Sequence, residues 1–242
     1  MTLESRGIDQ HISREYNREL LDLHAHVIGM GALVQTQLRD AVRALVLGDA
    51  SLAQTVIARE PDVNGMELRI DQEANLVLVR RQPAAGDLRL VFAIIKAVID
   101  LERVGDIARR IAATGLEYRG PETLAAHLGT LGNAVEAILA TSLDAFSRLD
   151  PELALGVRAE DSAIDAECKA VSARLMVAMT EDPGNVTTGV SLVLAARSLE
   201  RVGDHAKNIA EYVSYAVLGK DIRHMRAEER EQWLRSRESP QP

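Results

Sequence analysis

One twelve-residue segment occurs twice in this chain. Residues 101–112 read LERVGDIARRIA and residues 199–210 read LERVGDHAKNIA, which makes them identical at nine of twelve positions. Chance does not produce a match this close, and internal repetition indicates a structural unit that is present more than once. The sequence therefore predicts two copies of one fold in tandem within 242 residues.

Apolar residues recur every three or four positions through most of the chain, which is the period of an amphipathic α-helix. Glycine, proline and aspartate interrupt this pattern and predict where helices end and begin. Pro61 is expected to kink or restart the second helix, and Asp150 with Pro151 is expected to cap the fifth. The six predicted helices cover approximately residues 8–47, 50–81, 88–117, 124–149, 151–180 and 186–218.

Each copy of the repeated segment lies late in the third helix of its half. Hydrophobic residues make up 47% of the chain but aromatic residues only 3%, a composition typical of helical bundles built from Leu, Ala, Val and Ile. The predicted fold class is all-α, with two tandem pseudo-symmetric three-helix bundles. The predicted domains are a first bundle at residues 1–119, a second at 120–220, and a charged, mobile tail at 221–242.

Composition narrows the possible functions. There are 28 Lys and Arg against 36 Asp and Glu, a net charge of −8, so neither a basic field nor an aromatic stacking platform favours nucleic acid as a partner. The single cysteine, Cys168, cannot form an internal disulfide, as expected in a reducing cytoplasm. The N-terminus lacks the apolar core of a secretory signal, and charged residues break the most apolar run, residues 88–101, so we expect no transmembrane segment.

The repeated segment carries two carboxylates that face the same way. Glu102 and Asp106 are four residues apart on one helix, and Glu200 and Asp204 repeat this spacing in the second half. Two negative charges one helical turn apart repel each other, so a positive charge is expected to neutralise them. The glycine between them, Gly105 in the first copy, falls on the buried stripe and is expected to allow a neighbouring helix to approach closely.

The second helix of each half offers further oxygen ligands. Asp161 and Asp165 are again four apart, and Glu60 and Asn64 are their counterparts by pattern. If neighbouring helices are antiparallel, each half gathers an all-oxygen cluster, which suits Mg²⁺, Mn²⁺, Ca²⁺ or iron and suits Zn²⁺ or Cu²⁺ poorly. Because Asn64 carries no charge, the first half is expected to bind more weakly. The predicted metal ligands are Glu60, Asn64, Glu102, Asp106, Asp161, Asp165, Glu200 and Asp204.

A solvated acidic helix face is the alternative interpretation of the same residues. Arg103 and Arg201 follow the glutamates, and Arg109 or Lys207 could pair with the aspartates. Exposed ion pairs of this kind contribute little to stability and indicate no ligand.

Three histidines could in principle be ligands. His205 lies beside Asp204, but its counterpart in the first copy is Ile107, which favours a surface histidine. His24 and His26 lie two residues apart and cannot share a helical face, so they are expected at a surface or an interface.

Several segments together carry a resemblance to a known family. They are HISREYNREL at residues 11–20, RRQPAAGDLRLV at 80–91, both LERVGD segments, and NIAEYVSYAVLGKDIRHM at 208–225. With these segments the chain resembles the PhoU family of regulators of bacterial phosphate uptake over nearly its whole length. The doubled LERVGD and the turn at 80–91 are the most specific of these features.

The resemblance implies a cytoplasmic homodimer without catalytic activity. PhoU-like proteins are regarded as negative regulators that act between the phosphate ABC transporter, including its ATPase subunit, and a sensor histidine kinase of the phosphate-starvation response. Some members hold multinuclear metal clusters on paired E(D)-x-x-x-D motifs, which match Glu102/Asp106, Glu200/Asp204 and Asp161/Asp165 here. The metals implied are iron, Mn or Mg rather than Zn. Asn64 departs from the motif.

Two other functions remain open from the residues alone. One is a purely structural helical interaction module in which no metal binds. The other is a carboxylate-bridged di-iron or di-manganese oxidase, whose chemistry normally needs Glu-x-x-His on two helices. The sequence contains no Glu-x-x-His, which weighs against the oxidase.

Overall fold

The structure is a computed structural model that describes residues 14–221, 225 and 229. The described part is helical and contains no strand, which confirms the predicted all-α class. The elements are α1 (Arg14–Leu47), α2 (Ala50–Ala58), α3 (Glu60–Arg81), α4 (Ala85–Glu117), α5 (Glu122–Ala125), α6 (His127–Arg148), α7 (Pro151–Glu181), a short 3-10 helix (Pro183–Asn185) and α8 (Val186–Leu218).

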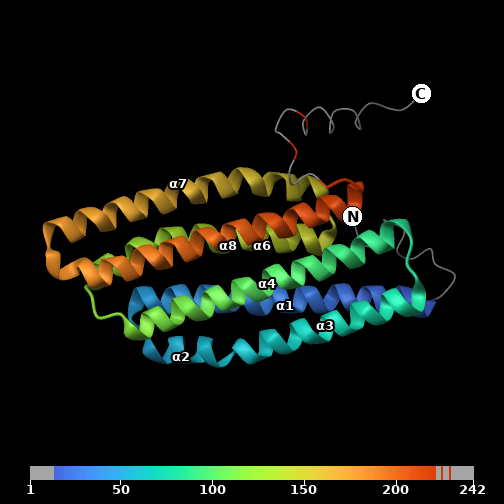
Figure 1. The fold of residues 1–242 in the computed structure, drawn as a ribbon, viewed down its shortest axis with the longest axis horizontal. Helices are drawn as coiled ribbons and strands as arrows, with labels where there is room; N and C mark the ends of the chain where they lie inside the picture. The colour runs from blue at the N-terminus through green and yellow to red at the C-terminus, as the bar shows by residue number, and fades with distance from the viewer. Residues whose placement is uncertain (1–13, 222–224, 226–228, 230–242) are drawn as a thin grey trace.

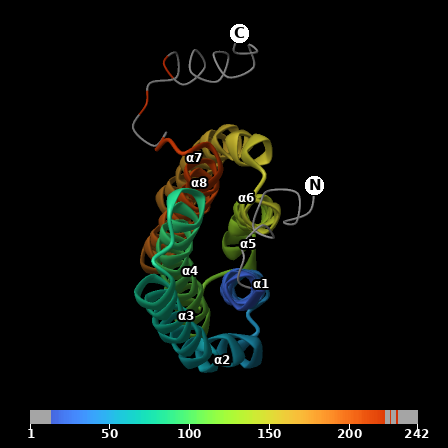
Figure 2. The ribbon, with the colours of Figure 1, turned by 90° about the vertical axis from the view of Figure 1, so that its right-hand side faces the viewer.

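The long helices form two similar bundles that lie against each other. The first contains α1, α3 with its extension α2, and α4, and the second contains α6, α7 and α8 (Figure 1). Seen along the long axis, α3, α4, α8 and α7 follow one another in one layer, and α1 and α6 form the second layer (Figure 2). The buried side chains of both bundles form a continuous core, since α4 packs on α8 and α1 packs on α6. The expected pair of pseudo-symmetric bundles is confirmed.

Most helix ends lie where the glycine, proline and aspartate residues of the sequence predict them. Gly48 adopts a left-handed backbone with φ of +65°, and the Asp49 side chain accepts a hydrogen bond of 2.9 Å from the Leu52 amide at the start of α2. Pro61 lies in the first turn of α3, after the helix has restarted. Asp150 caps α7 by accepting from two backbone amides.

Two boundaries differ from the prediction. Helix α4 begins at Ala85 instead of Leu88, directly after the turn. The predicted helix at 124–149 is divided into α5 and α6 at Ala126, where neither glycine nor proline marks the break. The predicted start of the first helix at residue 8 and nearly all of the predicted tail lie outside the described residues.

The contact between α1 and α6 depends on two glycines that occupy equivalent places in the two halves. A Cβ added to Gly31 would collide with the side chain of Leu143, and a Cβ added to Gly132 would collide with that of Val42. Both the two glycines and the two apolar partners are 101 residues apart in sequence. The duplicated unit therefore packs against its own copy through a reciprocal pair of contacts.

The contact between α4 and α8 contains a buried polar network centred on Asp100. This carboxylate is 3% exposed and accepts hydrogen bonds from His205 Nδ1 at 2.6 Å and from the Tyr212 hydroxyl at 2.7 Å. The side chain of Asn208 lies 3.4 Å away. The prediction of a surface His205 is therefore wrong, because a carboxylate on the other bundle provides the partner that allows it to be buried.

His24 is likewise buried, at the contact between α1 and α6. Its Nε2 donates to the Phe146 carbonyl oxygen at 3.0 Å, and its ring stacks on the Phe146 ring. Burial lowers the pKa of His24, so the neutral imidazole is favoured. Of the two expected locations, surface or interface, the interface is the correct one. Within the described residues, no helix is both long and apolar enough to cross a membrane.

Candidate functional site

The predicted acidic residues of the first half lie where α3 packs on α4. Glu60 of α3 is 2.9 Å from the Arg109 guanidinium of α4. Burial raises the pKa of the Glu102 carboxyl, and the negative charges of Asp106 and Glu60 raise it further. Three of the four predicted ligands therefore share one region, and Asn64 lies exposed on α3.

Glu67 belongs to the same region and was missed from the sequence. Burial raises the pKa of this carboxyl, and the negative charges of Glu102, Asp71 and Asp106 add to the rise. The signal that could have found it is the spacing of residues 60, 64, 67 and 71, which places four oxygen-bearing side chains along one stripe of α3. The first half therefore carries more negative charge than Glu60, Glu102 and Asp106 alone provide.

Glu67 and Glu102 are expected to destabilise the metal-free protein at neutral pH. A carboxyl whose pKa is raised by folding is penalised when ionised, and the penalty disappears as pH falls through the folded pKa towards the usual value near 4.3. We expect Glu67→Gln and Glu102→Gln each to raise the free energy of unfolding at pH 8 by about 0.2–0.5 kcal/mol, the size of a like-charge helical pair. Urea denaturation at pH 8 and pH 4 measures this gain.

The gain should be largest at pH 8 and vanish at pH 4, because the wild-type carboxyls are then protonated as well. Glu160→Gln, at an exposed position on α7, serves as the control and should have little effect at either pH. A gain that grows on acidification would contradict an origin in the ionised carboxylates.

In the second half, one lysine joins two of the predicted ligands. Lys207 Nζ of α8 is 2.6 Å from Asp161 Oδ2 of α7 and 2.8 Å from Asp204 Oδ1. Burial lowers the pKa of Lys207, but the hydrogen bonds to the two carboxylates outweigh it, so the pKa is raised and the ammonium form is held. Arg197 donates to both carboxylate oxygens of Glu200 at 3.0 Å. Three of the four predicted ligands in this half are thus paired with cations of the chain itself.

The other carboxylate oxygen of Asp161 is buried and has no hydrogen-bond partner among the described residues. The residue is 7% exposed, and a Cβ built on Gly203 would lie 3.3 Å from this Oδ1 atom. The absence of a side chain at Gly203 therefore leaves the oxygen room beside α8. A buried carboxylate oxygen without a donor is costly, and a hard cation is one group that would satisfy it.

Asp165 completes the predicted set on α7. Its charge and that of Glu200 contribute to the raised pKa of Cys168, for which burial is the main cause. Cys168 stands 101 residues after Glu67, the same separation as between Glu60 and Asp161, so a thiol replaces the extra carboxylate in this half. Its Sγ lies 3.6 Å from the Ala196 carbonyl oxygen, inside the core.

The donor chemistry of both regions suits a hard cation, but their side chains are arranged as ion pairs. In the part of the chain that the structure describes, no three His, Cys, Asp or Glu side chains converge as a metal ion requires. Residues that could hold one in the second half are Asp161, Asp165, Glu200 and Asp204, with the buried oxygen of Asp161 as the strongest point of fit. The eight-residue metal set stays a prediction.

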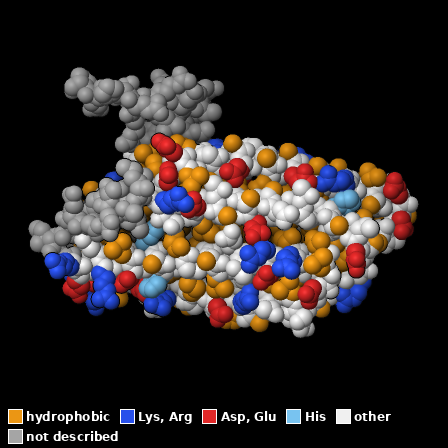
Figure 3. All heavy atoms as spheres, turned by 180° about the vertical axis from the view of Figure 1, so that it is seen from behind, with side chains coloured by type: hydrophobic (Ala, Val, Ile, Leu, Met, Phe, Trp, Pro, Cys, Tyr) orange, Lys and Arg blue, Asp and Glu red, His pale blue; other side chains and the backbone are white. Residues whose placement is uncertain are grey.

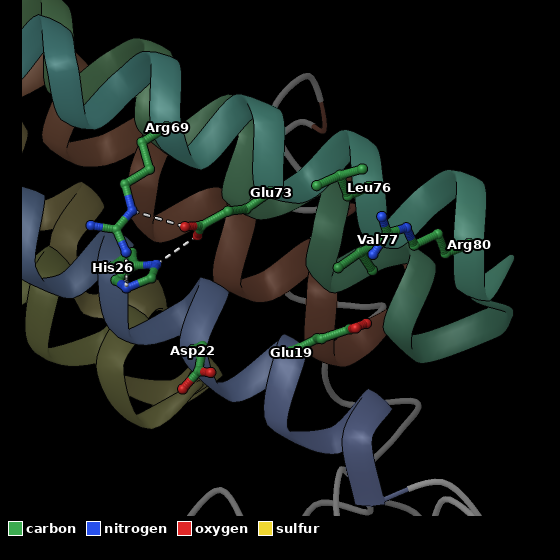
Figure 4. A pocket seen from close by; sticks show the side chains of 8 residues that line it. All are labelled: Glu19, Asp22, His26, Arg69, Glu73, Leu76, Val77 and Arg80. Atoms are coloured by element: carbon green, nitrogen blue, oxygen red, sulfur yellow. Dashed lines mark hydrogen bonds and ion pairs between the residues drawn. The ribbon is translucent and has the colours of Figure 1, made fainter.

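A separate cleft of about 280 Å³ lies between α1 and α3 (Figure 4). His26 lies at one end of the cleft, where its Nδ1 is 2.6 Å from Glu73 and its Nε2 is 3.3 Å from Arg69. Since arginine can only donate, Nε2 accepts and Nδ1 carries the proton that Glu73 accepts. The remaining lining residues are Glu19, Asp22, Leu76, Val77 and Arg80.

Charges of both signs also alternate outside this cleft. Figure 3 shows acidic and basic side chains interspersed over the face turned away from the viewer in Figure 1. On this face the charges do not gather into a large field of one sign.

Comparison with known proteins confirms the resemblance seen in the sequence. The PhoU domain matches residues 27–114 and again residues 128–213. A phosphate-specific transport system accessory protein PhoU homolog of Pseudomonas putida is 43% identical over 92% of this chain and 88% of its own. The PhoU accessory protein of Escherichia coli K12 is 37% identical over 98% of this chain and 99% of its own.

Solved structures agree with this assignment. The crystal structure of PhoU from Pseudomonas aeruginosa superimposes with a TM-score of 0.80 at 42% identity, covering 85% of this chain and 100% of that one. The phosphate transport system regulatory protein PhoU from Streptococcus pneumoniae gives a TM-score of 0.78 at 27% identity, covering 85% of this chain and 98% of that one. Each half of the duplicated fold matches a PhoU domain, and the chain belongs to the PhoU family.

Proposed function

We propose that this protein is a non-enzymatic accessory regulator of phosphate transport, which restrains phosphate uptake and the phosphate-starvation response when phosphate is plentiful. The observation that carries the proposal is the match of both halves to the PhoU domain, together with relatives of nearly equal length that are named phosphate-specific transport system accessory proteins. The Streptococcus pneumoniae relative is named a regulatory protein of the same system.

The protein would act in the cytoplasm as a homodimeric adaptor between the ATPase subunit of a phosphate ABC transporter and a sensor histidine kinase. Two similar bundles in one chain support this role, because they offer related but chemically different acidic faces at α3–α4 and α7–α8. Iron, Mn or Mg at these faces would supply positive charge that neutralises the paired carboxylates. Asp161, Asp165, Glu200 and Asp204 would hold the cation in the second half.

The described side chains support a role without catalysis. Burial raises the pKa of the Cys168 thiol, which disfavours the nucleophilic thiolate. His205 is hydrogen-bonded to Asp100 within the contact between the bundles, where it is buried from solvent. His26 accepts from an arginine on its second nitrogen. The two histidines thus link neighbouring helices, His205 of α8 to α4 and His26 of α1 to α3.

Deletion of the gene tests the regulatory role. In medium rich in phosphate we expect the deletion strain to express phosphate-uptake genes as if it were starved, and the wild-type gene in trans should restore repression. A transcriptional reporter measures the effect, with a strain grown in low phosphate as the reference for full induction. Unchanged expression in the deletion strain would refute the proposal.

A purely structural module without metal is the second candidate, and the pairing of Lys207 and Arg197 with the acidic residues favours it. Replacing Glu200 and Asp204 by alanine in the complementing gene separates the two. The metal-dependent adaptor predicts loss of repression, whereas the structural module predicts repression close to the wild-type level. Circular dichroism of the purified variant establishes that it is folded.

A further inference from the structure

We propose that Lys207 is a built-in counter-ion of the α7–α8 acidic site, which competes with a metal cation for Asp161 and Asp204. The inference rests on the metal-binding part of the proposed function and concerns what the chain does when no metal is bound. In this view the ammonium group stabilises the metal-free state and sets how tightly a metal can bind.

The ammonium group of Lys207 lies between two carboxylates of the predicted metal site. Lys207 Nζ bridges one carboxylate from α7 and one from α8, at 2.6 and 2.8 Å. The Asp161 side chain is 10% exposed and that of Lys207 is 22% exposed, so solvent screens their attraction only partly. Without the lysine, a largely buried carboxylate would remain without a cation, which is strongly unfavourable.

The pair between the second and third helices recurs in the first half, which indicates that this part of the arrangement belongs to the duplicated unit. Arg109 lies 98 residues before Lys207, at the equivalent place in the repeated segment, and it pairs with Glu60 at 2.9 Å. Glu60 lies 101 residues before Asp161. A cation on the third helix of each bundle therefore joins the equivalent carboxylate on the second helix.

Competition follows from electrostatics. A divalent cation held by Asp161 and Asp204 would stand close to the ammonium group, and two positive charges at that distance repel each other. The lysine side chain is long and flexible and can withdraw into solvent, whereas Asp161 is fixed by burial. The unpartnered Asp161 Oδ1 is the atom that Lys207 leaves available to an incoming cation.

Lys207→Met tests the proposal in the full-length, chelator-treated protein, with Mn²⁺ as the probe. We expect its melting temperature in EDTA to fall by roughly 2–6 °C, and Mn²⁺ to restore more of this loss than it adds to the wild type. Isothermal titration should show an Mn²⁺ affinity about tenfold higher than that of the wild type, since the competing charge is gone. Lys169→Met, at an exposed position on α7, is the matched control and should change neither quantity.

A double variant, Lys207→Met with Asp161→Asn, guards against a trivial loss of folding. If Lys207 neutralises Asp161, the double variant should melt in EDTA close to the wild-type temperature and lose the gained Mn²⁺ affinity. Equal Mn²⁺ affinity in the wild type and Lys207→Met would overturn the counter-ion role and leave the metal site intact. Absence of Mn²⁺ binding in every variant would overturn both the counter-ion role and the metal-binding part of the proposed function, while leaving the gene-deletion test of regulation unaffected.

Discussion

Replacing Asp100 by alanine is expected to lower the free energy of unfolding by about 3–5 kcal/mol, because the partners of a buried carboxylate would lose their acceptor. The carboxylate of α4 accepts from His205 and Tyr212 of α8, and all three groups are buried between the bundles. Alanine leaves a cavity and removes the acceptor from two buried polar groups that water cannot reach freely. The variant should therefore weaken the contact that joins the two halves.

Urea denaturation followed by circular dichroism measures this loss, and Ser198→Ala is the matched control. Ser198 lies 98 residues after Asp100, at the equivalent place on α8, and its hydroxyl donates to the Leu194 carbonyl oxygen within the same helix. We expect the control to change the free energy of unfolding by less than about 0.5 kcal/mol. An Asp100→Ala variant as stable as this control would show that the network contributes nothing to the contact between the bundles.

Leucine at Gly31 or Gly132 is expected to cost about 1–3 kcal/mol, by forcing α1 and α6 apart. A Cβ at either position already meets a side chain of the opposite helix, Leu143 or Val42. Val42 is branched at Cβ and has little rotamer freedom, so Gly132→Leu should be the more damaging change. Because one substitution separates the helices at both places, the double variant should cost less than the sum of the two.

Gly129→Leu is the control for this pair. It lies on α6 as well, but among the described residues a Cβ at this position has no neighbour within 4 Å outside its own helix. Leucine has a higher helix propensity than glycine, so the control should leave the melting temperature unchanged or raise it. If Gly129→Leu destabilises as much as Gly132→Leu, the close approach of the helices is not the cause.

The helical architecture could be predicted from the sequence because its signals are local. The apolar period, the caps at Asp49 and Asp150 and the restart at Pro61 depend on residues within one or two turns of each other. The duplicated segment added one piece of long-range information, namely that the two halves have the same fold. It also placed Glu102 with Asp106 and Glu200 with Asp204 at equivalent positions of the third helix in each half.

Partners across the contact between the bundles could not be predicted. His205 and Asp100 are 105 residues apart, and their equivalents in the other half, Ile107 and Ser198, carry no matching polarity. A single sequence gives no sign that two such residues will meet. Glu67 is a different case, since continuing the stripe of α3 beyond Asn64 would have found it.

The core that runs unbroken from one bundle into the other has a consequence for dissecting the molecule. Cutting the chain near residue 120 would remove α8 from its contact with α4, and α6 from its contact with α1. Each separate fragment would then expose a large apolar surface to solvent. Each repeat covers apolar surface of the other, so either fragment expressed alone is expected to aggregate. Co-expression of both fragments should restore solubility, because the two apolar surfaces can then pack together.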